Sequence, residues 1–330
     1  SGDDALMQAT AWGVKEMLLA EQVNVGLYSK IHDSLPTSHY TKLHYEQHFS
    51  GQNRLLQYQA ALRSKRIIFG GGSVLHSESD INLKRHLMAL ASAKKSRAVG
   101  VSLGPFQSVA AEKACAKFLN ECGFTGVRDQ KSLDIANSIA PNANVVKTFD
   151  LAPLLLSAQP KAIKEVARSG IALSLCSVAI TPMGEVNPQQ EQQRVEQFCQ
   201  LIIKLHQETG EAITLLEFNG HPLLGDWQIN QAITQRLAGK VPVTYKPYNP
   251  NPFAVLADLA SYKALINMRL HGSILGFLAN TPTLSINYHE KCQGWCQQIG
   301  LQNNYQFDLH SLDINQIQQQ VTQGLANGFI

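Results

Sequence analysis

Residues 263–288 read KALINMRLHGSILGFLANTPTLSINY, and this stretch predicts a strand, a helix and a second strand in direct succession. KALINM (263–268) and TPTLSINY (281–288) are short apolar runs, and HGSILGFLAN (271–280) between them is typical of a helix. Two short strands joined by a helix form the repeating unit of a parallel sheet, because the chain must cross back before the next strand starts. This stretch therefore predicts a parallel α/β domain.

The same alternation extends outward through the rest of the chain. Further strands are predicted at VNVGLYS (23–29), RIIF (66–69), AVGVSLGP (98–105), a segment ending at 127–128, GIALSLCSV (170–178), AITLLEF (212–218) and VPVTYK (241–246). Helices are predicted at 4–20, in a stretch that includes 44–48 and ends near 63, and at 80–93, 109–122, 189–209, 227–237, 251–262 and 313–325. We predict two doubly wound, Rossmann-like α/β domains that face each other across a cleft.

The expected domains are residues 1–160 and 161–330, with SAQPKAIKEVARSG (157–170) as the linker region. The chain opens with SGDDAL and runs straight into a helix, whereas an α/β domain normally begins with a strand. We therefore expect the first strand of the N-terminal domain to be missing.

The composition indicates a globular protein and argues against several other classes. Hydrophobic residues make up 44% of the 330 residues and charged residues 16%, as in a globular protein. A formal net charge of +3 is too small to indicate nucleic acid as a partner. The six cysteines lack disulfide-framework spacing, so we expect reduced thiols. No apolar stretch reaches the ~18 residues of a membrane span, and no secretion signal is recognisable, so a cytoplasmic location is expected.

Open α/β sheets bind ligands beyond the carboxyl ends of their strands, which directs attention to the residues that follow each predicted strand. These are Gly70 to Gly72, Ser102 to Pro105, Arg128 and Asp129, Asn219 to His221, Arg269 to Gly272, and Tyr288 to Lys291. Arg269 and His271 are the most suggestive pair. With Leu270 between them packed inward, both could face the cleft beside a helix that starts near Gly272, and a helix start suits an anion. The alternative is that Arg269 pairs with an acid of the other domain while His271 caps its own helix.

Other strand ends carry weaker signals. Arg128 stands at a strand-to-helix junction and would face the same cleft, while Asp129 or Ser132 is expected to cap the helix. FGGGS (69–73) has the look of a phosphate-cradling loop but matches neither GxGxxG nor the GK[ST] ending, and a tight turn close to another backbone is the favoured interpretation.

Metal binding is not expected. His44 and His48 would share a helix face, but the sequence has no HExxH pattern and offers no third ligand. Cys292 and Cys296 have the same spacing on a predicted helix, and we expect them to pack in the core.

Several strand-end segments together resemble the polysaccharide pyruvyl transferase family. They are GDDAL (2–6), FGGGSVL (69–75), GVSLGP (100–105), VRDQKS (127–132), Asp150 within TFDLAPLL, and NMRLHGSILGFLANTPTLSINYHEKCQGWCQQIGL (267–301). The last is the most specific, because it combines R-x-H with a Thr-Pro strand and Tyr-x-x-Lys. The resemblance covers nearly the whole chain.

The resemblance implies a two-domain architecture of the GT-B type. It also implies an activity, the transfer of a pyruvyl group from phosphoenolpyruvate to two hydroxyls of a sugar as a ketal, with no cofactor besides this donor substrate. His271 is then the candidate general acid and Arg269 a catalytic anion clamp. The expected phosphoenolpyruvate-binding residues are Arg128, Arg269, Leu270, His271, Gly272 and Lys291, and the expected acceptor-binding residues are Asp3, Asp4, Gly71, Gly72 and Ser73.

Two other functions compete with this one. A nucleotide-sugar-dependent glycosyltransferase of GT-B architecture would hold ribose and diphosphate in the second domain, although the short R-x-H spacing suits a smaller anion. A carbohydrate-binding or scaffold protein without activity would not need Arg128, Arg269 and His271 together. The expected partners are phosphoenolpyruvate and a sugar or lipid-linked glycan; peripheral association with a membrane and the oligomeric state are left open.

Overall fold

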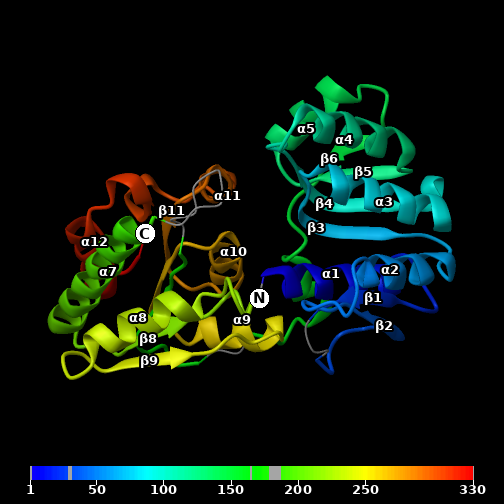
Figure 1. The fold of residues 1–330 in the computed structure, drawn as a ribbon. Coiled ribbons are helices and arrows are strands. Elements are labelled where there is room, and N and C mark those ends of the chain that lie inside the picture. The colour runs from blue at the N-terminus through cyan, green and yellow to red at the C-terminus, as the bar shows by residue number, and fades with distance from the viewer. Residues whose placement is uncertain (1, 29–31, 164–165, 178–186, 330) are drawn as a thin grey trace. The chain divides into compact units, whose positions relative to one another are not determined.

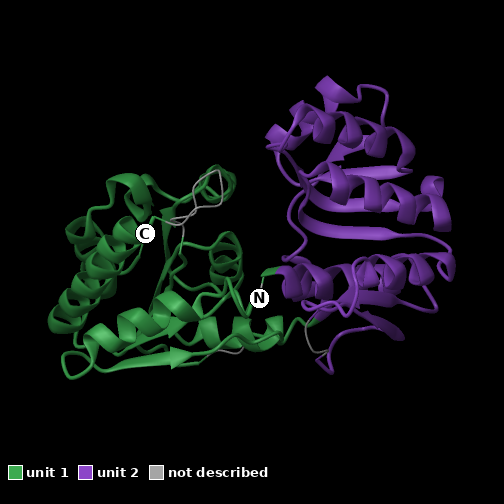
Figure 2. Ribbon diagram, viewed as in Figure 1, with its two compact units in different colours: residues 1–2, 159–330 green, residues 3–158 purple. Residues whose placement is uncertain are grey.

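The computed structural model describes residues 2–28, 32–163, 166–177 and 187–329. The chain forms two compact α/β units (Figures 1 and 2): unit 1 comprises residues 1–2 and 159–330, and unit 2 comprises residues 3–158. The division falls between Ala158 and Gln159, where the sequence suggested a boundary at 160. Lys164 and Glu165 of the expected linker lie outside the described residues, as do residue 29 and residue 178 at the ends of two predicted strands.

Unit 1 is built on a six-stranded parallel sheet. Its strands are β7 (Ile171–Ser174), β8 (Ile213–Leu216), β9 (Val243–Lys246), β10 (Ala264–Asn267), β11 (Thr283–Asn287) and β12 (Gln306–Asp308). They lie in the order β12-β11-β10-β7-β8-β9, so the chain moves outward from β7 through β8 and β9 and then returns to place β10 on the other side of β7. The predicted doubly wound sheet is therefore confirmed here, with its change of direction between β7 and β10.

Helices cover both faces of this sheet. They are α7 (Pro188–Thr209), α8 (Trp227–Leu237), α9 (Pro252–Ala260), α10 (Leu270–Leu278), α11 (Glu290–Gln298) and α12 (Ile314–Asn327), with short 3-10 turns at Asn303–Tyr305 and Leu309–Ser311. α7 packs against α8 and α12, and α10 packs against α9 and α11 (Figure 1). Every residue of β7, β8 and β10 is buried, which explains why these strands are uninterrupted apolar runs.

Local signals in the sequence define the helix ends. α7 begins after Asn187, whose side chain accepts a hydrogen bond from the Gln190 N–H, and it ends at Gly210 with a φ of 67°. α9 likewise follows Asn251, with Pro252 in its first turn. Asparagine satisfies a free N–H at a helix start, and glycine adopts the left-handed conformation that closes a helix without strain.

Unit 2 contains two parallel sheets. The larger has the order β3-β4-β5-β6, and the smaller pairs β1 with β2. The strands are β1 (Asn24–Leu27), β2 (His39–Lys42), β3 (Ile68–Leu75), β4 (Arg97–Leu103), β5 (Phe124–Val127) and β6 (Val145–Lys147). The helices are α1 (Gly2–Glu16), α2 (Gln52–Leu62), α3 (Glu78–Ala91), α4 (Val109–Glu121), α5 (Gln130–Ile139) and α6 (Leu154–Ala158), with a 3-10 turn at Ala93–Lys95.

The glycine run corrects the sequence prediction. A strand was expected to stop at Gly70, but β3 continues through the glycines to Leu75, and its register against β4 shifts between Gly72 and Leu75. Gly71 and Gly72 have φ angles of 71° and 81°, which bend the strand where it would otherwise end. A Cβ on Gly70 would lie 1.8 Å from Thr10 Oγ1 of α1. The glycines therefore allow a helix to lie close against the strand.

The predicted helix around His44 and His48 is wrong. β2 ends at Lys42, a loop follows, and α2 starts only at Gln52. The loop is held by Asn53, whose Oδ1 accepts from the His44 N–H (2.9 Å) and whose Nδ2 donates to the His44 carbonyl (2.8 Å). Among the described residues, no group of three or more His, Cys, Asp or Glu is arranged to hold a metal ion.

The six cysteines lie in the interior of the two units. All six cysteines are free thiols, as expected, and all are buried, as was expected for Cys292 and Cys296. Within the described part of the chain, every helix is too short or too polar to pass through a lipid bilayer.

Close packing at the glycine run gives a test of the fold. The substitution Gly70→Ala should lower the free energy of unfolding by about 1–3 kcal/mol, because the new methyl group overlaps the branched Thr10 side chain. Gly13→Ala is the matched control, since its Cβ meets nothing within 4 Å and alanine favours the helix. Urea unfolding followed by circular dichroism measures both; an equal response would contradict the packing argument.

Candidate functional site

The carboxyl ends of β7 and β10 form the central feature of unit 1. These adjacent strands pair in register, with Asn267 opposite Ser174, and the connections that follow them leave in opposite directions along the sheet. Diverging connections open a crevice, which is where ligands bind in open α/β sheets. The Met268 N–H donates to the Ser174 carbonyl (2.9 Å), so the next residue, Arg269, lies at this point.

Asn267 builds the turn from strand to helix. Its buried side chain donates from Nδ2 to the Arg269 carbonyl (2.6 Å) and to Ser273 Oγ (2.8 Å), while Oδ1 accepts from the Arg269 N–H (3.2 Å). A Cβ on Gly272 would lie 1.9 Å from Asn267 Oδ1. Gly272 is therefore needed for close packing against the turn.

Helix α10 starts earlier than the sequence suggested. It begins at Leu270, with Arg269 as its N-cap, rather than near Gly272. Leu270, His271 and Gly272 thus occupy the first turn, where backbone N–H groups have no acceptor within the helix and the helix dipole favours negative charge. Leu270 and His271 are partly exposed, and Gly272 is buried.

Arg269 is anchored on one side of its guanidinium. Nη2 forms an ion pair with Oδ1 of Asp226, a carboxylate that is only 1% exposed. The other oxygen of Asp226 accepts the N–H groups of Phe218 (3.1 Å) and Asn219 (2.9 Å). The alternative of an ion pair with an acid of the other domain is wrong, because Asp226 lies in the same unit, just before α8.

The Arg269 guanidinium has a further donor, Nε, next to the Nη2 that Asp226 binds. Its Nε is buried and, among the described residues, has no hydrogen-bond partner, although the side chain as a whole is 26% exposed. Burial opposes the charge, but the neighbouring Cys176 sulfur and Asp226 carboxylate outweigh burial and raise the pKa of Arg269 above its ordinary value. Arg269 is therefore cationic over the whole working pH range, and its partly exposed side chain places that charge at the strand end.

Cys176, which follows β7, is not a candidate nucleophile. It is fully buried, and burial raises the pKa of its thiol to about 12 despite the opposing influence of Arg269. The thiolate is the nucleophilic form, and it is nearly absent near neutral pH. Burial likewise raises the pKa of Tyr288, which follows β11, so its phenol stays neutral.

Lys291 lies at the same edge of the sheet as Arg269. It occupies the first turn of α11, after β11, and β11 pairs directly with β10. Its N–H donates to Nδ1 of His289, the N-cap of that helix (3.2 Å). The structure therefore brings the five unit 1 residues of the predicted donor site to neighbouring strand ends.

Arg128 belongs to unit 2 and has structural partners. It follows β5, is 7% exposed, and donates from Nη1 to Asp150 Oδ2 (2.8 Å) and from Nε to Ser102 Oγ (2.6 Å). Asp129 or Ser132 was expected to cap α5. Asp129 is the cap, because its side chain accepts a hydrogen bond from the Ser132 N–H (2.7 Å). Participation of Arg128 in an anion pocket with Arg269 stays a prediction.

The predicted acceptor residues occupy two places in unit 2. Asp3 and Asp4 lie in the first turn of α1, and after burial they are among the causes that raise the pKa of Tyr45. Gly71, Gly72 and Ser73 lie inside β3 rather than beyond its end, with the Leu6 side chain 2.8 Å from the position of a Gly71 Cβ. Sugar binding at either place stays a prediction.

Asp226 is the site residue that sequence reasoning missed. It ends the segment EFNGHPLLGD, which follows β8 and directly precedes α8. Asn219 to His221 within this segment were expected to lie at a strand end. The acid at the last position of the segment was the signal that could have identified Asp226 as a site residue. Its pairing with Arg269, 43 residues further along the chain, required the fold.

The two α/β units with parallel sheets place the protein among α/β proteins of GT-B type. The chain matches the sequence profile of the polysaccharide pyruvyl transferase family over residues 1–290, and it belongs to that family. None of the curated proteins compared with it matches the chain.

Solved structures of sugar-nucleotide epimerases share the fold. UDP-GlcNAc 2-epimerase from Neisseria meningitidis, solved bound to UDP-GlcNAc, is similar with a TM-score of 0.63 and 8% identity, over 99% of this chain and 90% of that one. The Methanocaldococcus jannaschii enzyme gives a TM-score of 0.58 and 9% identity, over 88% and 79%. At such identities the likeness supports the GT-B-type fold and nothing finer.

The buried ion pair gives a second test. Asp226→Ala should lower the free energy of unfolding by about 3–5 kcal/mol, because it leaves Arg269 and two backbone N–H groups without their acceptor. In the control, Asp258→Ala removes an exposed partner of Lys246 (2.8 Å) and should cost less than about 1 kcal/mol. Urea unfolding compares them; similar losses would mean that the Asp226 pair is energetically ordinary.

Proposed function

We propose that the protein transfers a pyruvyl group from phosphoenolpyruvate to two hydroxyls of a sugar in a polysaccharide or its precursor. The product is a pyruvate ketal, and no cofactor is needed besides the donor substrate. Family membership supports pyruvyl transfer. The geometry around Arg269 supports a small, doubly anionic donor.

The observation that carries this proposal is the partly exposed guanidinium of Arg269 at the start of α10, which the buried Asp226 carboxylate holds in place. Asp226 holds Nη2, so the guanidinium is oriented before a ligand arrives. Phosphoenolpyruvate carries a carboxylate and a phosphate on adjacent carbons, and the first-turn N–H groups of α10 can share these anions with Arg269. Each charge-assisted hydrogen bond contributes about 1.5–3 kcal/mol.

His271 is the proposed general acid. It protonates the methylene carbon of phosphoenolpyruvate, which becomes the methyl group and leaves an oxocarbenium-like centre at C2. One sugar hydroxyl attacks C2, phosphate departs with its bonding electrons, and the second hydroxyl closes the ketal. Of the two hydroxyl protons released, one restores His271 and the other leaves with the phosphate, so the reaction is balanced without a further reactant.

Thermal unfolding tests the donor. Phosphoenolpyruvate should raise the melting temperature of the protein, and Arg269→Lys should reduce the shift because lysine keeps the charge beside Asp226 but lacks the forked guanidinium donors. Arg236→Ala is the control, since Arg236 lies in the last turn of α8, away from the start of α10. A shift only with nucleotide sugars would instead favour a glycosyltransferase.

Turnover tests the acid. His271→Ala should lower phosphate release from phosphoenolpyruvate about 100- to 10,000-fold in the presence of a sugar acceptor, while the thermal shift with phosphoenolpyruvate remains. The measurement is a colorimetric phosphate assay on both proteins. Near-normal turnover would remove His271 from the mechanism.

A further inference from the structure

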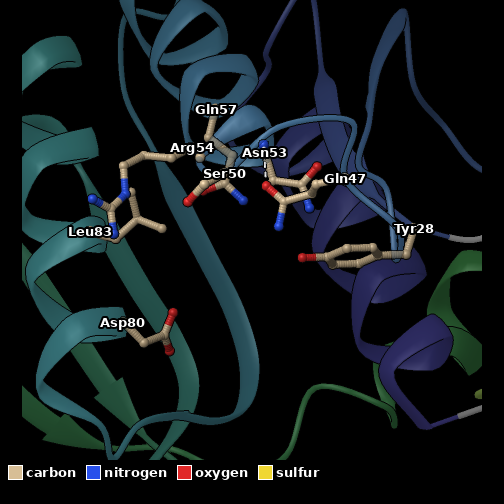
Figure 3. A pocket seen from close by; sticks show the side chains of 9 residues that line it. Tyr28, Gln47, Ser50, Asn53, Arg54, Gln57, Asp80 and Leu83 are labelled. Carbon is tan, nitrogen blue, oxygen red and sulfur yellow. Dashed lines mark hydrogen bonds between the residues drawn. The ribbon is translucent and has the colours of Figure 1, made fainter. Parts of the chain in front are cut away.

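Unit 2 contains a cavity of about 490 Å³ that includes none of the expected site residues. It is lined by Tyr28, Gln47, Ser50, Gly51, Asn53, Arg54, Gln57, Asp80 and Leu83 (Figure 3). The volume lies within the range of roughly 300–1,000 Å³ that small-molecule sites occupy. Most of its side chains carry hydrogen-bonding groups, so the cavity suits a ligand rich in hydroxyls.

Helical spacing creates the polar wall. Asn53, Arg54 and Gln57 recur at intervals of three and four residues, so they share one face at the start of α2, and Ser50 lies in the turn just before this helix. Leu83 and Asp80 face the same space from α3, as Figure 3 shows. The two helices pack against each other, which makes both walls parts of one scaffold.

The loop before α2 is already held by hydrogen bonds. The Asn53 side chain forms hydrogen bonds with the backbone of His44, and the Asn53 N–H donates to Gln47 Oε1 (3.1 Å). Within the described part of the chain, by contrast, the side chains of Arg54, Gln57 and Ser50 form no hydrogen bond with another residue. The cavity therefore combines a positioned loop with donors and acceptors that remain available to a ligand.

Tyr28 forms the opposite side of the cavity. Tyr28 is 43% exposed and stacks on Tyr45, with ring centroids 5.0 Å apart and planes inclined by 27°. A pyranose ring presents C–H groups on its faces and hydroxyls around its rim, so an exposed aromatic face opposite polar side chains is complementary to it. Asp3 and Asp4 act electrostatically on Tyr45, which places two of the expected acceptor residues near this pair.

The charges favour an uncharged sugar. Arg54 contributes one positive charge, and Asp80 contributes a negative charge that is also shared with Lys84 (2.5 Å). A carboxylate on the wall accepts hydrogen bonds from hydroxyls but repels a phosphate or a uronate. A cavity specialised for an anion would instead gather several cations without an acid.

We infer that this cavity binds a neutral hexose unit of the acceptor glycan, with a ring face on Tyr28 and hydroxyls bonded to Arg54, Gln57 and Asp80. The assignment of this sugar as acceptor rests on the proposed function. Tyr28 and Arg54 are then specificity-determining residues.

Saturation-transfer NMR tests the inference with methyl glucoside, methyl galactoside and methyl mannoside as separate probes. At least one should receive saturation on its ring C–H protons, and Tyr28→Ala or Arg54→Ala should each weaken that binding about tenfold or more. The matched controls are Tyr40→Ala on β2 and Arg63→Ala just after α2, both exposed and outside the cavity. These controls should bind the glycoside as the unchanged protein does.

The thermal shift with phosphoenolpyruvate separates this inference from the proposed function, because the cavity variants should keep that shift. A normal shift, with no glycoside bound or with binding that ignores Tyr28 and Arg54, would overturn the cavity assignment alone. Binding of inorganic phosphate that is lost in Arg54→Ala, without any glycoside signal, would also overturn it. Glycoside binding that depends on Tyr28 and Arg54 would support the sugar site even if phosphoenolpyruvate gave no shift.

Discussion

The ion pair between Arg269 and Asp226 is the constraint on which the candidate site depends. One buried carboxylate satisfies the guanidinium of Arg269 and the backbone N–H groups of Phe218 and Asn219. It therefore joins the end of β10 to the loop after β8 and to the start of α8. A charge at 1% exposure is tolerable because its oxygens are hydrogen bonded, and the same bonds hold the guanidinium in one orientation.

Comparison with Arg128 shows that two arginines at strand ends can differ in how their donors are satisfied. Arg128 also follows a buried parallel strand, but Asp150 and Ser102 occupy both its Nη1 and its Nε. Its charge thereby links the ends of β4 and β5 to the segment after β6. In Arg269, Nε has no partner among the described residues. The two arginines therefore differ in how many of their donors the described residues already satisfy.

The glycines of both units serve close packing. In β3 they make room for Thr10 and Leu6 of α1, and in α10 Gly272 makes room for the Asn267 side chain. The expectation of a close approach at FGGGS was therefore right in kind, although the neighbour is a helix side chain and the strand does not end there. A glycine in a sequence usually suggests a turn. At these positions it is needed because a neighbouring side chain leaves no room for a Cβ.

The sequence by itself determined the elements with strong local patterns. The predicted helix 227–237 matches α8 to the residue, and the strand and helix around Arg269 were placed to within two residues of their starts, because apolar runs and helical periodicity are local properties. The R-x-H segment could be recognised as a candidate site because ligands bind at strand ends. β6 and β12, with three residues each, went unpredicted since such short strands carry little pattern.

Only the tertiary structure decided which distant residues meet. The pairing of Asp226 with Arg269, the path of β3 through the glycines, the loop at His44 and the cavity beside Tyr28 all join residues that the sequence separates. Such contacts leave no periodic or local signature in the chain. They arise when strand order and helix packing bring side chains together. Strand order and helix packing in turn depend on how the whole core is buried.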